Sequence, residues 1–375
     1  MVKTDAQIRG VFRTDAEWLD HACNLSVRGL GNTWPNPSVG CVVVNNGRVV
    51  GRGTTGNGGR PHAEVQALRR AGLSAKNAEV FVTLEPCSHH GKTPPCTDAL
   101  INAGVGRVII GCLDPDPRVN GSGLARLQAA NIPTVVADHH RKSIEINTGF
   151  FKRVRQGRPF LTLKIASTLD GKTGMASGES RWITGPRARR HTHALRSRFD
   201  GILVGRGTIS ADNPMLDVRD MGSCPAPVRI VLDTNATIAS SARIITSAQL
   251  VPTWIICSQD ARSAKTLTLQ ESGAEIVPCI RNGSRVDLHA AMAALGERGL
   301  TRVLCEGGGT LAAALLAADL VDEVILYNAG KVIGADGLPS IGPLAFKMLA
   351  DVAQFDLVGL ERVGDDTVGR WMRRR

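Results

Sequence analysis

The chain has 375 residues, 43% of them hydrophobic, and a mean hydropathy of −0.03. These values are typical of a globular α/β protein long enough for two domains, each with its own core. No stretch approaches eighteen uninterrupted apolar residues, and residues 1–15 lack the apolar run of a secretory signal. Nine scattered cysteines are typical of a reducing compartment. We therefore expect a cytoplasmic protein with no membrane partner.

The net charge of +11 raises the question of nucleic-acid binding. The basic residues are dispersed, apart from the clusters at 187–190 and 373–375. The chain has one tyrosine and 4% aromatic residues, which provides few surfaces on which single-stranded bases could stack. The composition therefore favours small anionic substrates over nucleic acid as partners.

The first half alternates predicted strands and helices. Asn45-Asn46-Gly47 between the apolar runs 41–44 and 49–51 predicts a β-hairpin. A short helix begins near His62 and ends at Gly72. Further elements follow as strands at 80–84, 107–111 and 133–136, with a helix at 97–103. This alternation predicts a layered α/β sandwich.

A cluster of metal-ligand residue types lies in this half of the chain. His62, Cys87 and Cys96 can hold Zn²⁺ and leave a fourth position for water, as in a catalytic zinc site. Glu64, two residues after the histidine, can take a proton from that water and deliver it to a leaving amine. The pattern matches the H-x-E and P-C-x-x-C signature of zinc deaminases, except that eight residues separate the two cysteines here.

Other interpretations of these residues exist. An isolated H-x-E is frequent by chance, and buried cysteines are usually inert. A structural zinc site would need a fourth protein ligand, which His89 or His90 could supply. The complete pattern on a strand–helix framework favours catalysis, because a helix beginning at Cys96 would stabilise its thiolate.

A charged segment at 151–159 ends in Gly-Arg-Pro and is interpreted as a domain junction, which gives domains 1–157 and 158–375. Beyond it, strands are predicted at 160–166, 201–204, 228–232, 254–257, 302–305 and 323–327, and helices near 186–198, 288–299 and 310–318. The Gly307-Gly308-Gly309 loop could approach a phosphate, or could simply form a tight strand-to-helix turn. A cluster rich in anion-binding groups, which could equally form a solvated face, consists of Lys164, Ser180, Arg196, Asp212 and Arg219.

Motifs in both halves resemble those of the bifunctional riboflavin-biosynthesis deaminase/reductase family. In the first half they are Asn36–Gly40, His62–Val65, Leu84–His89 and Gly91–Cys96. In the second half they are Lys164–Gly171, Ser177–Ile183, Asp212–Pro214 and Glu306–Gly308. The long cysteine spacer is a feature of this family.

The resemblance implies a fold and two consecutive reactions. It implies an N-terminal cytidine-deaminase-like three-layer sandwich and a C-terminal dihydrofolate-reductase-like domain. The first would deaminate 2,5-diamino-6-ribosylamino-4(3H)-pyrimidinone 5′-phosphate with zinc hydroxide. The second would reduce the ribosyl side chain with NADPH, giving 5-amino-6-(5-phospho-ribitylamino)uracil. It also implies a homodimer or a higher homo-oligomer.

The family pattern also assigns residues. Cofactor contacts would come from Ala166, Trp182, Thr208, Asp212, Gly307, Gly308 and Gly309. Substrate contacts would come from Ser180, Arg196, Leu216, Arg219, Glu306, Lys164, Asn36 and Lys92. Two positions depart from the family: Asn213 replaces a usual Asp, and Lys92 replaces a usual Arg, losing bidentate geometry.

Two other functions compete with this interpretation. One is a nucleic-acid base deaminase of the tRNA type with a C-terminal RNA-binding domain. The other is a non-enzymatic binding module stabilised by zinc. The scarcity of aromatic residues and the Ser177–Ile183 and Asp212–Pro214 motifs argue against the first, and Glu64 would have no role in the second.

Overall fold

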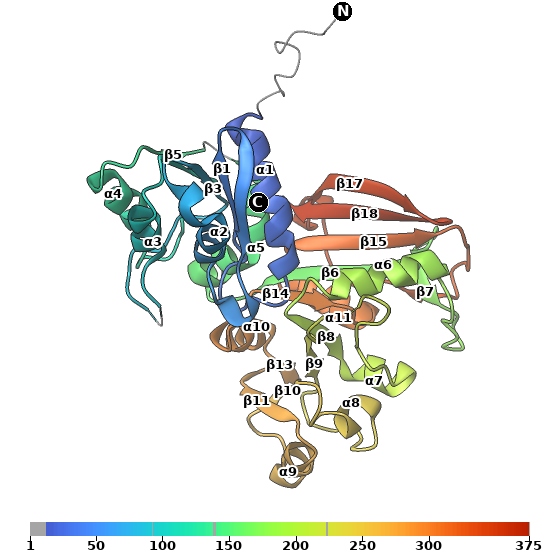
Figure 1. The fold of residues 1–375 in the computed structure, drawn as a ribbon. Coiled ribbons are helices and arrows are strands. Elements are labelled where there is room, and N and C mark those ends of the chain that lie inside the picture. Colours follow the sequence, from blue (N-terminus) through green and yellow to red (C-terminus); the bar gives the residue numbers. More distant parts are fainter. Residues whose placement is uncertain (1–12, 92, 138–139, 223, 375) are drawn as a thin grey trace, which may run out of the picture. The chain divides into compact units, whose positions relative to one another are not determined.

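The computed structural model describes residues 13–91, 93–137, 140–222 and 224–374 (Figure 1). The chain forms two compact units that divide between Arg155 and Gln156. This division lies within the segment at 151–159 that the sequence predicts as a domain junction. The helix α5 (Arg141–Gln156) continues to its middle, because Phe150 and Phe151 are buried in the core of the first unit. None of the helices in the described part of the chain combines the length and apolar character needed to cross a bilayer.

The first unit is built on a five-stranded sheet in the order β2-β1-β3-β4-β5. Its strands are β1 (Gly40–Asn45), β2 (Arg48–Thr54), β3 (Glu79–Val82), β4 (Arg107–Ile110) and β5 (Thr134–Val136). Its helices, besides α5, are α1 (Asp15–Ser26), α2 (Ala63–Ala71), α3 (Cys96–Asn102) and α4 (Ser122–Ala129). β1 runs antiparallel to β2 and β3, whereas β3, β4 and β5 are parallel.

Helices cover both faces of this sheet, which confirms the predicted three-layer sandwich (Figure 1). On one face, Leu19 and Ala22 of α1 pack against Val42 and Phe81. On the other face, Ala67 of α2 and residues of the following helices pack against the alternate side chains of the same strands. Alternation of side chains therefore assigns β1, β3 and β4 to both cores.

The hairpin predicted at Asn45–Gly47 is present. β1 and β2 pair from Gly40 opposite Thr54 to Asn45 opposite Arg48, with one register shift between Val43 and Val44. Asn46 and Gly47 have φ of 50° and 71°, the left-handed region that a two-residue hairpin turn of this twist requires. Asparagine and glycine adopt that region more readily than other residues.

The second unit contains a nine-stranded sheet in the order β11-β10-β9-β8-β14-β6-β15-β18-β17. Its strands are β6 (Phe160–Thr168), β8 (Gly201–Gly205), β9 (Val228–Leu232), β10 (Thr253–Ser258), β11 (Glu275–Cys279), β14 (Arg302–Cys305), β15 (Glu323–Ala329), β17 (Phe355–Val363) and β18 (Asp366–Arg373). All pairs from β11 to β15 are parallel, and the last two strands are antiparallel. This is the expected dihydrofolate-reductase-like α/β domain.

The remaining elements of the second unit connect these strands. Its helices are α6 (Pro186–Arg196), α7 (Arg206–Asp212), α8 (Arg243–Thr246), α9 (Ser263–Glu271), α10 (Leu288–Glu297) and α11 (Gly309–Ala317). Two small ribbons pair β12 (Arg281–Asn282) with β13 (Arg285–Val286), and β7 (Lys172–Gly174) with β16 (Leu338–Pro339). The sequence predicted neither the β17–β18 hairpin nor α7, since β17 is largely exposed on both faces and α7 is seven residues long.

Close packing of α2 on β2 depends on glycine. A Cβ atom at Gly53 would lie 2.1 Å from the carbonyl oxygen of Ala63, the first residue of α2. A contact this short forces the helix away from the sheet. His62 and Glu64 flank Ala63, so the position of these two side chains is linked to Gly53.

We predict that Gly53→Ala lowers the free energy of unfolding of the first unit by about 1–3 kcal/mol and weakens zinc binding at His62. Urea unfolding and zinc content measure the two effects. Gly330→Ala is the control, because a Cβ atom there meets nothing within 4 Å. Unchanged stability of Gly53→Ala would show that α2 can shift without cost.

Candidate active sites in the two units

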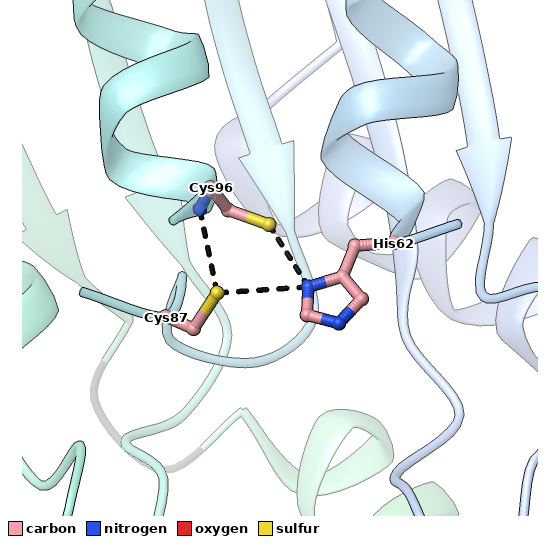
Figure 2. A group of neighbouring side chains, drawn as sticks. All are labelled: His62, Cys87 and Cys96. Atoms are coloured by element: carbon pink, nitrogen blue, oxygen red, sulfur yellow. Dashed lines mark hydrogen bonds between the residues drawn. The ribbon is translucent and has the colours of Figure 1, made fainter. Parts of the chain in front are cut away.

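Three side chains from separate elements meet in the first unit (Figure 2). The Nδ1 atom of His62 lies 3.0 Å from the Sγ atom of Cys96 and 3.6 Å from that of Cys87. The ligand atoms of all three residues lie within 4.8 Å of one another. One imidazole and two thiols at this spacing fit a Zn²⁺ ion with three protein ligands, which leaves a coordination position for a reacting water molecule.

The backbone around these ligands places them accurately. His62 is the N-cap residue of α2, one position before the first turn predicted for it. Cys96 is the first residue of α3. The backbone N–H of Cys96 donates to the Sγ atom of Cys87 at 3.3 Å, and that of Thr97 donates to the Cys87 carbonyl at 3.2 Å. The start of α3 thus holds the cysteine loop and favours negative charge on the sulfur.

The surroundings shift the pKa values of these groups in different directions. A hydrogen bond from Cys96 lowers the pKa of Cys87, and the same bond raises the pKa of Cys96. The hydrogen bond with Cys87 raises the pKa of His62. Burial raises the pKa of Glu64, although the neighbouring His62 opposes this. Glu64 is 4% exposed, so its carboxyl group can exchange a proton with little competition from bulk water.

These residues open onto a cavity of about 260 Å³. Asn36, one of the predicted substrate contacts, lines it together with His62, Glu64 and Cys87. Lys92, the other predicted contact in this unit, lies outside the described residues. The cavity also presents cations and carboxylates that sequence reasoning did not select: Arg60, Asp114, Asp116, Arg118 and Arg153. Burial raises the pKa of Asp114 to about 6.

Sequence reasoning also missed the role of Glu85. Its side chain is 4% exposed and accepts four hydrogen bonds from backbone N–H groups, those of Asp114, Gly121, Gly123 and Leu124. Glu85 therefore joins the loop after β4 to the segment carrying Cys87. In the sequence, only the position of Glu85 directly before Pro86-Cys87 could indicate this role, because its hydrogen-bond partners are distant along the chain.

In the second unit, three charged side chains meet beside the central strands. The Nε and Nη2 atoms of Arg196 donate to the two carboxylate oxygens of Glu306 at 2.6 and 3.0 Å. The Nζ atom of Lys164 lies 4.0 Å from Glu306. Strand register brings Lys164 and Glu306 together. β14 pairs with β6 so that Cys305 lies opposite Leu163. Lys164 is the next residue on β6, and Glu306 directly follows β14.

The ion pairs set the protonation of this cluster. Burial would raise the pKa of Glu306, but Arg196 and Lys164 lower it further than burial raises it. Burial lowers the pKa of Lys164, and Glu306 partly offsets that change. The guanidinium fork of Arg196 is occupied by Glu306. Arg219 contacts Asp217 and His193 at 3.4 Å each, but its side chain is 65% exposed and can still reach a substrate phosphate.

Most other predicted reductase residues line two cavities. One, of about 400 Å³, is lined by Ser180, Trp182, Arg196, Asp212, Leu216 and Arg219. The other, of about 880 Å³, is lined by Thr208, Gly308 and Gly309. Ala166 lies on β6 opposite Tyr327. Gly307 and Gly309 pack closely, because a Cβ atom there would lie 2.7 Å from Leu311 and 2.5 Å from the Pro339 carbonyl.

Asn213, which stands where the family usually has an aspartate, has a structural role at the end of α7. Asn213 ends α7 in the left-handed conformation, with φ of 43°, which asparagine tolerates better than most residues. Its Oδ1 atom accepts a hydrogen bond from the Arg243 backbone at 2.9 Å. An aspartate could accept the same bond, so asparagine at this position preserves the end of α7.

Comparison with known proteins links both units to one family. Residues 13–112 match the family model described as the cytidine and deoxycytidylate deaminase zinc-binding region, and residues 159–369 match the RibD C-terminal domain. The chain is 42% identical over 369 residues to riboflavin biosynthesis protein RibD of Escherichia coli, covering 94% of this chain and 97% of the relative. It is 40% identical to the Haemophilus influenzae RibD, with 94% and 95% covered.

Solved structures show the same similarity over both units. Acinetobacter baumannii RibD matches with a TM-score of 0.87 at 34% identity, covering 96% of this chain and 99% of that one. A Thermotoga maritima protein described as a diaminohydroxyphosphoribosylaminopyrimidine deaminase/5-amino-6-(5-phosphoribosylamino)uracil reductase matches at 0.83 and 30% identity, with 96% and 99% covered. The second unit thus matches a reductase domain, which disfavours an RNA-binding role for it. The chain belongs to the RibD family of bifunctional deaminase/reductases of riboflavin biosynthesis.

Proposed function

We propose that the two units, as domains 1–157 and 158–375, catalyse two consecutive steps on one phosphorylated pyrimidine. The first would deaminate 2,5-diamino-6-ribosylamino-4(3H)-pyrimidinone 5′-phosphate. The second would reduce the ribosyl chain of the product to ribityl with NADPH. The observation that carries the proposal is the meeting of His62, Cys87 and Cys96 beside the buried Glu64, in a chain whose other unit holds the Lys164–Glu306–Arg196 cluster.

For the first step, His62, Cys87 and Cys96 would hold the zinc ion, which activates a water molecule for attack on the ring carbon that carries the amine. Glu64 takes a proton at its carboxylate and returns it to the departing nitrogen, so that ammonia leaves as a neutral molecule. Its raised pKa brings the carboxyl closer to the pH at which it must both accept and donate. Asn36, at the cavity wall, binds the ring.

For the second step, bound NADPH would supply the hydride that reduces C1′ of the ring-opened ribosylamine. Lys164 and Glu306 position the polar end of the sugar, and the buried Lys164 ammonium can donate the proton that the reduced group requires. Arg196 keeps Glu306 ionised and fixed, whereas Arg219 and Ser180 bind the substrate at the cavity wall. Thr208 and the Gly307–Gly309 loop hold the cofactor phosphates.

We further propose that the protein acts in the cytoplasm as a homodimer or a higher homo-oligomer. The nine free cysteines suit a reducing compartment. Nucleic acid is not proposed as a partner, since the cavities are lined by charged groups suited to a small phosphorylated molecule. The alternative of a binding module stabilised by zinc gives no role to a buried carboxyl group beside the metal ligands.

We predict that Glu64→Gln releases ammonia from the diaminopyrimidine substrate at least about 100-fold more slowly but retains zinc. Glutamine keeps the shape of the side chain and removes its ability to carry the proton. Ammonia release and zinc content measure the two properties. Glu145→Gln, on the surface of α5, is the control. Ammonia release at the wild-type rate by Glu64→Gln would contradict the assigned proton transfer.

Removal of zinc should separate the two activities. We expect a chelator to abolish ammonia release and to leave NADPH oxidation intact when the deaminated intermediate is supplied. The zinc ligands all belong to the first unit, and the charged cluster of the second unit contains none of them. Loss of both activities with retained secondary structure would contradict two independent sites. Added Zn²⁺ should restore ammonia release.

We also predict that Lys164→Met slows NADPH oxidation with the deaminated intermediate at least about 100-fold and leaves ammonia release unchanged. Methionine keeps the apolar stem and removes the ammonium group. Lys265→Met, on the exposed face of α9, is the control. Because the pKa of Lys164 is lowered by burial, wild-type reduction should decline with rising pH before the ordinary lysine pKa is reached. NADPH oxidation by Lys164→Met at the wild-type rate would exclude Lys164 from the reaction.

A further inference from the structure

Two arginines line the larger cavity of the second unit. Its volume is about 880 Å³, and Arg206, Arg285 and His289 line it. The side chain of Arg206 is 53% exposed, and Arg285 and His289 are also exposed. These side chains come from three segments, the start of α7, the short strand β13 and the first turn of α10. The fold therefore brings side chains that are separate in the sequence to one cavity.

The two carboxylates that line the same cavity are already engaged. Asp233 is 3% exposed, and its Oδ2 atom accepts a hydrogen bond from the Ile238 backbone at 2.6 Å. Its Oδ1 atom accepts one from Thr237 at 3.1 Å. Asp287 accepts from the Ala290 backbone at 2.7 Å as the N-cap of α10. Asp233 is therefore engaged at both carboxylate oxygens, whereas the Asp287 cap bond uses its Oδ1 atom.

Asp233 and Arg206 bear on the choice of nucleotide. In Rossmann-type dinucleotide sites, an acidic residue at a strand end typically binds the ribose 2′-hydroxyl of NADH, whereas a nearby arginine accommodates the 2′-phosphate of NADPH. Asp233 directly follows β9, at the carboxyl edge of the sheet, but it is turned inward. Arg206 pairs with it, with Nε 4.0 Å from Oδ1, yet the Arg206 side chain remains 53% exposed. Arg206 can therefore still offer guanidinium N–H groups to a ligand in this cavity.

The α7 helix runs between the two cavities of the second unit. Its first residue, Arg206, lines the larger cavity, and its last residue, Asp212, lines the cavity that is also lined by Arg196. Seven residues of helix span about 10 Å. A dinucleotide with its nicotinamide at the Arg196 end, where the proposed reaction takes place, would extend its adenosine past Thr208 toward Arg206.

We propose that Arg206, with Arg285, binds the 2′-phosphate of NADPH and so determines the preference of the reductase for NADPH over NADH. The proposal rests on the reductase function given above and adds the residues that select the cofactor. Guanidinium groups suit this task, because each can donate two parallel hydrogen bonds to a phosphate.

The test compares dissociation constants for NADPH, NADH, 2′,5′-ADP and ADP on the full-length, zinc-loaded protein. In the double variant Arg206→Gln/Arg285→Gln, NADPH and 2′,5′-ADP should bind at least about tenfold more weakly, since hydrogen bonds to charged groups are lost. NADH and ADP, which lack the 2′-phosphate, should change less than about twofold. Arg190→Gln/Arg262→Gln removes the same charge outside the cavity and should leave all four constants unchanged.

The outcomes separate this inference from the proposed function. A double variant that folds, and keeps the wild-type ratio of NADPH to NADH affinity, overturns the inference while leaving the reductase assignment intact. Equal weakening of NADPH and NADH also overturns it, because the arginines would then act on the shared part of the cofactor. Wild-type protein that binds neither dinucleotide would defeat the reductase assignment itself.

Discussion

The alignment of parallel strands is the constraint on which both sites depend. Parallel neighbours end at the same edge of a sheet, so the residues that follow them are brought together whatever their separation in the chain. In the first unit this places the loop with Cys87 after β3, beside the loop after β4. In the second unit it places Lys164 on β6 beside Glu306 after β14, and Arg206 after β8.

Two buried carboxylates fix the residues at these edges by accepting hydrogen bonds. Glu85 satisfies four backbone N–H groups, and Glu306 satisfies the guanidinium fork of Arg196. A buried carboxylate is costly unless it is paired or hydrogen-bonded, so each fixes its partners as firmly as they stabilise it. One anchors a loop beside the metal ligands. The other leaves a cation, Lys164, beside a fixed anion in the reductase site.

Local signals predicted much of the fold. The hairpin at Asn45–Gly47, the helix after His62 and the helix beginning at Cys96 were all read from turn residues and apolar spacing, and all are present. The charged segment at 151–159, predicted as a domain junction, contains the division between the two units, although burial of Phe150 and Phe151 continues α5 through its first half. The β17–β18 hairpin was not predicted, because β17 has no buried face and therefore lacks the alternation of apolar and polar residues that indicates a strand.

The sequence by itself determined the chemistry: one histidine, two cysteines and a glutamate in a spacing that resembles one enzyme family. Ligand identity is local information, because each residue type carries its own donor atoms and pKa. Only the tertiary structure decided which charges are free. Arg196 is occupied by Glu306, and Asp233 is turned toward Thr237 and Ile238, whereas Arg206 and Arg285 remain exposed at their cavity. Pairing depends on contacts distant along the chain, and these exist only in the folded protein.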